Sequence, residues 1–257
     1  MTDAPRRALV TGAGRRLGRA IALDLALAGW DIAVHYRSSG AEAEEVVREI
    51  RAFGRNAAAV GADLGAASET DGLVDSAAEA LGGLDLLVNS ASIFRPDRAQ
   101  DLTAESFDRH FAVNLRAPLQ LARDFAARLE EDREGNIVNI IDQRVWRPTP
   151  LYFTYAASKF ALWGATRTLA QALAPRIRVN AIGPGPSLAH ERQSAEGFAA
   201  EAAAIPLGRG PGLGEFGAAV RFIVATPSMT GQMIALDGGQ HLAWRTPDVI
   251  AGDERSG

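Results

Sequence analysis

Short runs of hydrophobic residues alternate with amphipathic stretches along the whole chain. Seven of these runs are candidate strands, and most of them are rich in β-branched residues or leucine and lack a polar alternation, which is typical of strands buried on both faces. They span residues 7–11, 31–36, 56–63, 84–89, 135–141, 177–182 and 233–237. The pattern therefore predicts seven strands, most of them in the interior of a parallel sheet.

Apolar residues recur at helical spacing between these runs, most clearly over 16–29, 41–54 and 112–132. Gly29 and Gly54 stand where helix C-termini are commonly closed by glycine. Because strands and helices alternate, we expect an α/β fold: a doubly wound, Rossmann-type parallel sheet with helices on both faces. No linker or repeat divides the 257 residues, so the prediction is a single domain over 1–257.

One segment breaks the alternation. Residues 183–214 have a helical centre between stretches rich in glycine and proline. Loops of this kind often carry binding residues or close over a site. We therefore expect a substrate loop or lid here.

Composition excludes several classes of protein. The formal net charge of −4 and the lack of a basic stripe interleaved with aromatics argue against a nucleic-acid partner. With zero cysteines and four histidines that lack ligand spacing, no disulfide and no metal site is expected. No apolar run is long enough to span a membrane and no signal peptide is recognisable, so we expect a cytoplasmic protein without a membrane partner.

A glycine turn, "VTGAGRRLG" at 10–18, follows the first strand and opens a helix. Backbone amides in such a turn can cradle a pyrophosphate. The second strand ends in "HYRSS" at 35–39, with no acid before Glu42, although NAD sites usually place an acid there. Arg15 and Arg16 should approach the same spot, and arginines with hydroxyls suit a 2′-phosphate. We predict NADP(H) as the cofactor; the alternative is a tight turn with solvated basic residues.

The stretch "YAASK" at 155–159 contains the only lysine of the sequence. Four residues apart, Tyr155 and Lys159 share one face of a helix. A cation about 4 Å from the phenol would lower the pKa of Tyr155 from about 10 toward neutrality, where proton transfer is efficient. An ammonium also bonds a ribose hydroxyl better than a guanidinium does. The alternative is a surface lysine beside a half-buried tyrosine.

Several weak motifs occur together and in order. "TGxxxxxG" is followed by Asp63-Leu64, "NSAS" at 89–92, Asn114, the Tyr155/Lys159 pair and "GPG" at 183–185. This set resembles the short-chain dehydrogenase/reductase family over nearly the whole chain. The resemblance implies that Tyr155 donates a proton, that Lys159 grips the nicotinamide ribose and that Asn114 holds a water in the proton relay.

Three positions depart from the common family pattern. Arg16 replaces the second glycine of the turn, "NSAS" replaces Asn-Asn-Ala-Gly, and Asp142 replaces a serine. An ionised Asp142 would repel the oxyanion that forms in ketone reduction. A carboxyl with a raised pKa, or a water bound to it, can instead protonate the nitrogen of a C=N bond. The alternative is a carboxylate that merely caps a strand end or pairs with Arg144 or Arg147.

With these departures the chain resembles the pteridine reductase branch, which uses NADPH to reduce pterins or folates. The resemblance makes Asp142, Tyr155, Lys159 and Asn114 catalytic, and lets Phe94 and the nicotinamide sandwich a pterin. The substrate contacts it implies are Arg16, Ser92, Phe94, Asp142 and Tyr155. The cofactor contacts expected from the motifs and the resemblance are Gly12, Arg15, Arg16, Leu17, His35, Tyr36, Arg37, Ser38, Asp63, Leu64, Asn89, Ser90, Ala91, Tyr155, Lys159, Pro184, Gly185, Ser187 and Leu188.

The expected reaction is hydride transfer from NADPH to C6 of a 7,8-dihydropterin, with a proton reaching N5. Two alternatives stay open: a carbonyl reductase of the same family and, in another class, a non-catalytic NADPH-binding sensor. Residues 143–154 match no segment we can place, which leaves the pterin side chain open. Family members are usually tetramers, so a homotetramer is expected. In it, residues 238–248 of a neighbouring subunit would reach an active site through Trp244 or Arg245.

Overall fold

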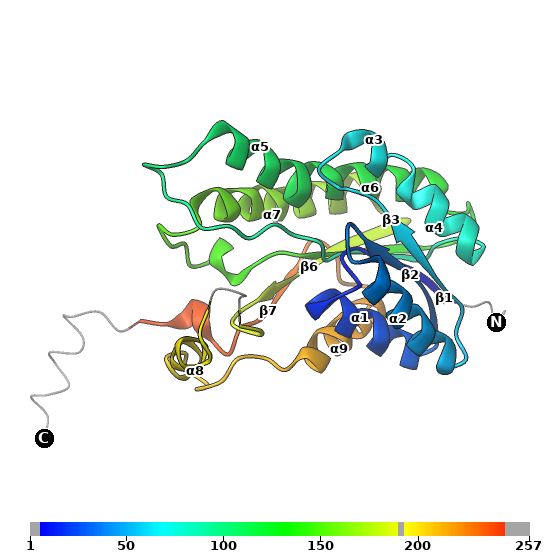
Figure 1. The fold of residues 1–257 in the computed structure, drawn as a ribbon. Coiled ribbons are helices and arrows are strands. Elements are labelled where there is room, and N and C mark those ends of the chain that lie inside the picture. The colour runs from blue at the N-terminus through cyan, green and yellow to red at the C-terminus, as the bar shows by residue number, and fades with distance from the viewer. Residues whose placement is uncertain (1–5, 190–192, 245–257) are drawn as a thin grey trace, which may run out of the picture.

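The computed structural model describes residues 6–189 and 193–244. Seven parallel strands form one sheet in the order β3-β2-β1-β4-β5-β6-β7 (Figure 1). The strands are β1 (Arg6–Val10), β2 (Trp30–Tyr36), β3 (Ala57–Gly61), β4 (Leu86–Asn89), β5 (Gly135–Ile140), β6 (Ile177–Pro184) and β7 (Met233–Leu236). The predicted fold class and all seven predicted strands are confirmed.

The central strand explains why these runs lack a polar alternation. Ala8 and Val10 on β1 pack into one hydrophobic core, and Leu9 between them packs into the core on the other side of the sheet. All three residues are fully buried. Because helices cover both faces, consecutive side chains all need to be apolar.

Helices α1 (Arg16–Leu27), α2 (Gly40–Ala52) and α9 (Leu213–Val224) cover one face, and α4 (Leu73–Leu81), α6 (Ala117–Arg128) and α7 (Phe153–Leu173) cover the other (Figure 1). The shorter helices are α3 (Ala67–Thr70), α5 (Ala104–Phe111) and α8 (Ala195–Ala203), with the short helical turns η1 (Ala112–Arg116), η2 (Gln143–Val145) and η3 (Gln240–Leu242). Two predicted helices end slightly early, at Leu27 and Ala52. Gly29 and Gly54 follow in the left-handed region, at φ +91° and +76°. The predicted helix 112–132 opens as a π-helix, η1, and ends at Arg128.

The strand order fixes where a ligand can bind. The chain runs outward from β1 to β2 and β3, then returns to place β4 on the other side of β1. Connections leaving β1 and β4 therefore diverge, and a crevice opens at their carboxyl ends. The glycine turn and the segments after β2, β4, β5 and β6 all meet at this edge.

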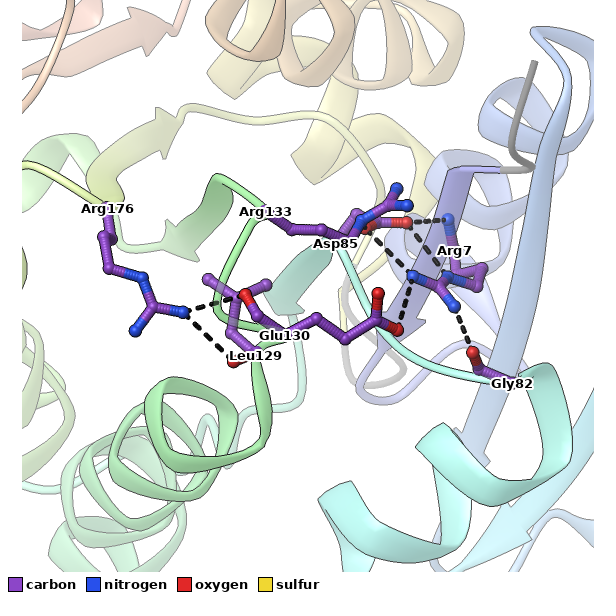
Figure 2. A network of polar contacts seen from close by, with 7 residues as sticks. All are labelled: Arg7, Gly82, Asp85, Leu129, Glu130, Arg133 and Arg176. Carbon is purple, nitrogen blue, oxygen red and sulfur yellow. Dashed lines mark hydrogen bonds and ion pairs between the residues drawn. The ribbon is translucent and has the colours of Figure 1, made fainter. Parts of the chain in front are cut away.

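The opposite edge of the sheet is held by arginines (Figure 2). The buried guanidinium of Arg7 pairs with Asp85 at the start of β4 (3.1 Å) and with Glu130 after α6 (3.3 Å). Arg133 pairs with the same Asp85 at 2.6 Å. Arg176 donates to the carbonyl oxygens of Leu129 and Glu130. The cations of this network are all arginines. The single lysine of the sequence, Lys159, lies instead at the carboxyl ends of the strands.

The predicted substrate loop is shorter than 183–214. Its first two residues, Gly183 and Pro184, belong to β6, and its last two, Leu213 and Gly214, belong to α9. Helix α8 occupies the middle of the remainder. Among the described helices, none has the length and apolar character needed to cross a membrane.

Candidate active site

A cavity of about 1000 Å³ opens at the carboxyl ends of the strands. It lies at the upper end of the usual range for ligand pockets, roughly 300–1,000 Å³, which suits a long cofactor with a substrate beside it. Every residue predicted to contact cofactor or substrate lines the cavity except Asn89. Of the predicted catalytic residues, Asn114 alone lies behind its wall.

The glycine turn has the shape that a pyrophosphate needs. Gly12 adopts φ +66°, and a Cβ added to Gly18 would lie 2.3 Å from the carbonyl oxygen of Gly12. Neither position tolerates a side chain. Arg15, the N-cap of α1, makes no side-chain cap. The first amides of α1 therefore keep their hydrogens for a ligand, helped by the helix dipole.

His35 supports this turn from behind. The amide of Gly12 donates to its Nδ1 at 3.0 Å, so Nε2 carries the hydrogen and donates to the carbonyl oxygen of Ala62 at 3.1 Å. Burial lowers the pKa of His35 to about 4. The imidazole is therefore neutral at physiological pH and joins the ends of β2 and β3 to the glycine turn.

The two arginines of the turn point to different places. The Arg15 guanidinium pairs with Glu42 in the first turn of α2, the helix that follows β2. Arg16 instead donates to the carbonyl oxygen of Ala189 at 3.1 Å. The prediction that both arginines converge on one spot is therefore wrong, because successive side chains leave a tight turn in different directions.

Arg16 also has an unusual backbone conformation. Its φ is +52°, in the left-handed region. This conformation costs a non-glycine residue roughly 1–2 kcal/mol. A glycine would take this conformation without that cost, and backbone strain of this kind is found at functional sites.

Asp142 stands at the centre of the polar cluster. The hydroxyl of Tyr155 donates to its Oδ2 at 2.8 Å. Arg144 donates through its backbone amide to Oδ1 at 2.8 Å and through Nη1 to Oδ2 at 3.0 Å. The alternative interpretation holds, since Asp142 caps η2 and pairs with Arg144. Asp142 also faces Tyr155, and its catalytic role stays a prediction. The carboxyl accepts all three of these hydrogen bonds.

The predicted effect of Lys159 on Tyr155 is wrong in this structure. Burial, and next the charge of Asp142, raise the pKa of Tyr155 well above 10. The cation that acts in the opposite direction is Arg144. Lys159 is buried, donates to the carbonyl oxygen of Ile140 at 2.8 Å, and has its pKa lowered to about 8 by burial. The phenol stays protonated because burial would deprive a phenolate of its hydration and because the hydroxyl donates to a carboxylate.

Asn114 holds the loop after β4. Its Oδ1 accepts from the amide of Ile93 at 2.8 Å, and its Nδ2 donates to the carbonyl oxygen of Ile93 at 3.0 Å. Further bonds join it to the hydroxyls of Ser92 and Ser158. The side chain is therefore fully engaged, and its π-helical setting in η1 is of a kind frequent at functional sites.

Aromatic rings form one wall of the cavity. Phe94 stacks on Tyr152 with centroids 4.2 Å apart and an interplanar angle of 9°. The edge of Tyr155 meets Phe94 at 4.7 Å. The Arg144 guanidinium lies 5.6 Å from both Phe94 and Tyr152. The sequence interpretation included Phe94 but missed Tyr152, although its spacing of three from Tyr155 places it one helical turn away.

A threonine was also missed as a site residue. Thr11 Oγ1 accepts from the amides of Ser90 and Ala91, at 2.9 and 3.0 Å. It therefore fastens the end of β4 beside the glycine turn. Asn89 does not reach the cavity, because its Nδ2 donates to Asn139 Oδ1 at 2.8 Å inside the sheet.

The two tail residues stand differently. Trp244 is the last described residue, and 60% of it is exposed. Arg245 lies outside the described residues. Contact between this tail and a neighbouring subunit stays a prediction.

Within the described ranges, no three His, Asp or Glu side chains gather in a way that could hold a metal ion.

Known proteins share both the sequence pattern and the fold of this chain. The family model for the short chain dehydrogenase matches residues 6–196. The crystal structure of FolM Alternative dihydrofolate reductase 1 from Brucella canis, complexed with NADP, is 52% identical, with a TM-score of 0.92 over 95% of this chain and 97% of that chain. A short chain dehydrogenase from Burkholderia cenocepacia in complex with NADP is 39% identical, with a TM-score of 0.85 over 93% and 98%. The 3-oxoacyl-[acyl-carrier-protein] reductase FabG of Staphylococcus aureus is 31% identical over 92% of this chain and 98% of that protein.

Proposed function

Because this chain belongs to the short-chain dehydrogenase family, we propose that it is an NADPH-dependent reductase of a pterin or dihydropterin. One observation carries the proposal: the carboxylate of Asp142 accepts the Tyr155 hydroxyl hydrogen bond inside the cavity, at 2.8 Å. A carboxylate at this point suits protonation of nitrogen and opposes the oxyanion of ketone reduction.

The residues present fit NADP(H). The free amides at the start of α1 suit the pyrophosphate, and the exposed Arg37 and Ser38 suit a 2′-phosphate. Lys159 lines the cavity and donates one described hydrogen bond, to Ile140, so two ammonium hydrogens remain for ribose hydroxyls. When bound, NADPH supplies the hydride. Two of the compared structures contain NADP, which supports this assignment.

The aromatic wall supports a flat substrate. Phe94 and Tyr152 present parallel rings at the cavity, next to the hydroxyl of Tyr155. Flat heteroaromatics stack on such rings. The Brucella protein at 52% identity is named an alternative dihydrofolate reductase, and dihydrofolate contains a pterin ring. We propose a 7,8-dihydropterin as substrate, with reduction at C6 and protonation at N5.

The proton source follows from the hydrogen bonds. Tyr155 keeps its proton because burial and Asp142 raise its pKa well above 10. Asp142 has accepted three donors and keeps about one lone-pair site for a substrate N–H or a water. Tyr155 is therefore the proton donor, and Asp142 orients the substrate through one of its N–H groups, or holds a water beside it.

A carbonyl reductase is the second candidate. Tyr155 and Lys159 suit that reaction too, and the 31% identical Staphylococcus aureus relative is named for a 3-oxoacyl substrate. Asp142 is the feature against it.

Exposed aromatic side chains on α5 and α7, namely Phe107, Phe153 and Phe160, support association of subunits, and we propose a homotetramer.

A turnover assay with NADPH tests the proposal. The purified protein is mixed with NADPH and either dihydrobiopterin, dihydromonapterin, dihydrofolate or a panel of ketones, and NADPH oxidation is followed by absorbance. We expect turnover with at least one dihydropterin. Ketone turnover without pterin turnover would transfer the assignment to the carbonyl reductase, and NADPH binding without any turnover would indicate a sensor.

A further inference from the structure

We propose that Arg144 is a positioning residue of this site: its guanidinium keeps the Asp142 carboxylate ionised and aimed at Tyr155, so that the phenol carries the transferable proton. The inference rests on the proposed function and adds a residue that neither the family motifs nor the resemblance assigned. It concerns the arginine that the sequence interpretation treated only as a possible partner of a structural carboxylate.

The geometry of the pair is the first support. Two donors of Arg144, its backbone amide and Nη1, bond the two oxygens of Asp142 at 2.8 and 3.0 Å. Both carboxylate oxygens are thereby fixed in direction. The side chains are 20% and 10% exposed, so solvent screens this pair much less than a surface pair. An ion pair of this kind favours the charged carboxylate.

The fixed orientation of Arg144 is the second support. Its guanidinium lies 5.6 Å from the rings of Phe94 and Tyr152, which limits its rotation. Tyr152 itself is held at φ +57° at the start of α7. The same arginine thus touches the aromatic wall and the polar cluster, and it couples the position of a stacked ring to the direction of the carboxylate.

The charges around Asp142 are the third support. Tyr155 and Lys159 approach from α7, and Arg144 approaches from η2. Lys159 Nζ is bonded to the carbonyl oxygen of Ile140, and Tyr155 is neutral. Of these three groups, Arg144 alone makes a described ion pair with Asp142. Removing its charge would leave a buried carboxylate with two neutral donors, the Tyr155 hydroxyl and the backbone amide of residue 144, and no cation bonded to it, a state that protonation relieves.

The test uses Arg144→Met, which keeps an unbranched apolar stem, and Arg144→Lys, which keeps the charge. The matched control is Arg147→Met, since Arg147 bonds the carbonyl oxygen of Gln240 and has no described contact with Asp142. With a dihydropterin, we expect Arg144→Met to lower kcat about 10- to 100-fold with little change in KM. The acid limb of its kcat–pH profile should move to higher pH, and Arg144→Lys should move it partly back.

A substrate-independent measurement separates this inference from the proposed function. Infrared titration follows the protonated carboxyl band that disappears in Asp142→Asn. We expect this band to appear at higher pH in Arg144→Met than in the wild-type protein and in Arg147→Met. Wild-type titration in Arg144→Met would overturn the role of Arg144 whatever the substrate is. A shifted band in a protein that reduces only ketones would uphold that role and reject the pterin.

Discussion

Tyr155 gives its hydroxyl hydrogen to Asp142, a residue 13 positions earlier, at 2.8 Å. The tyrosine lies in the first turn of α7, and the aspartate lies just after β5. This hydrogen bond connects the predicted proton donor to Asp142, the residue that replaces the serine of the common family pattern. Substitutions in this cluster and in the cofactor site beside it should therefore have distinct effects.

The Asp142→Ser variant should reduce dihydropterins poorly. A serine hydroxyl is a weaker acceptor than a carboxylate for a substrate N–H or a water, so we expect kcat/KM to fall about 100-fold. A serine can donate to an oxyanion, so ketone turnover should be unchanged or higher. Steady-state kinetics on both substrate classes measures this, with circular dichroism to verify folding. Wild-type pterin kinetics would remove Asp142 from the mechanism.

The Tyr155→Phe variant should bind NADPH normally and turn over almost no substrate. Loss of the proton donor should lower kcat by about 10²- to 10⁴-fold. Fluorescence titration gives the NADPH affinity, and single-turnover kinetics gives the chemical step. A variant with the wild-type rate would show that another group delivers the proton.

The lysine should be needed for more than its charge. The pKa of Lys159 is about 8, so the ammonium of the free enzyme is lost as pH rises through this value, and kcat/KM should fall above about pH 8. Lys159→Arg keeps the charge at every working pH, which should abolish this alkaline limb. Its planar guanidinium does not fit the buried position, so activity should still drop at least about 100-fold.

The control for this variant is Arg167→Lys, an exchange of the same two residue types at an exposed site on α7. Its pH profile should equal that of the wild-type protein. If Lys159→Arg were fully active, charge alone would explain the lysine.

His35 should make stability depend on pH below neutrality. Its pKa in the folded protein is about 4, below the 6.5 of the unfolded chain, so the unfolded state binds more protons between these values. The contribution is present above pH 6.5 and is lost as pH falls toward 4, about 3 kcal/mol in total. His35→Asn keeps an acceptor for the amide of Gly12 without titrating in this range.

Urea unfolding of both proteins from pH 7 to 4 measures the effect. The wild-type protein should lose more unfolding free energy than His35→Asn over this interval. Parallel curves would mean that His35 is not the group that titrates.

Arg37 should select the phosphorylated cofactor. Its exposed guanidinium lies at the end of β2, where a 2′-phosphate would be received, so Arg37→Gln should raise the KM for NADPH about tenfold and change that for NADH little. Arg48→Gln, at an exposed position on α2, is the control. A wild-type preference for NADH would contradict the cofactor assignment.

The resemblance to the family pointed to Asp142. The strands, the glycine turn and the shared helix face of Tyr155 and Lys159 could be predicted from the amino-acid sequence. These features are local: buried strands need continuous apolar runs, and a helix brings residues four apart onto one face. The left-handed turns at Gly29 and Gly54, which follow helices α1 and α2, were equally predictable, because glycine takes this conformation without cost.

Which charges meet depends instead on the folded chain. The predicted proximity of Lys159 and Tyr155 is confirmed, with the ammonium 5.7 Å from the centre of the phenol ring. Only the fold directs that ammonium to the carbonyl oxygen of Ile140 and brings Arg144 to Asp142. The fold likewise turns Arg16 away from Arg15 and adds Tyr152 to the aromatic wall. Side-chain direction and burial depend on neighbours distant in the sequence, and it is burial that reverses the pKa shift of a phenol beside a cation.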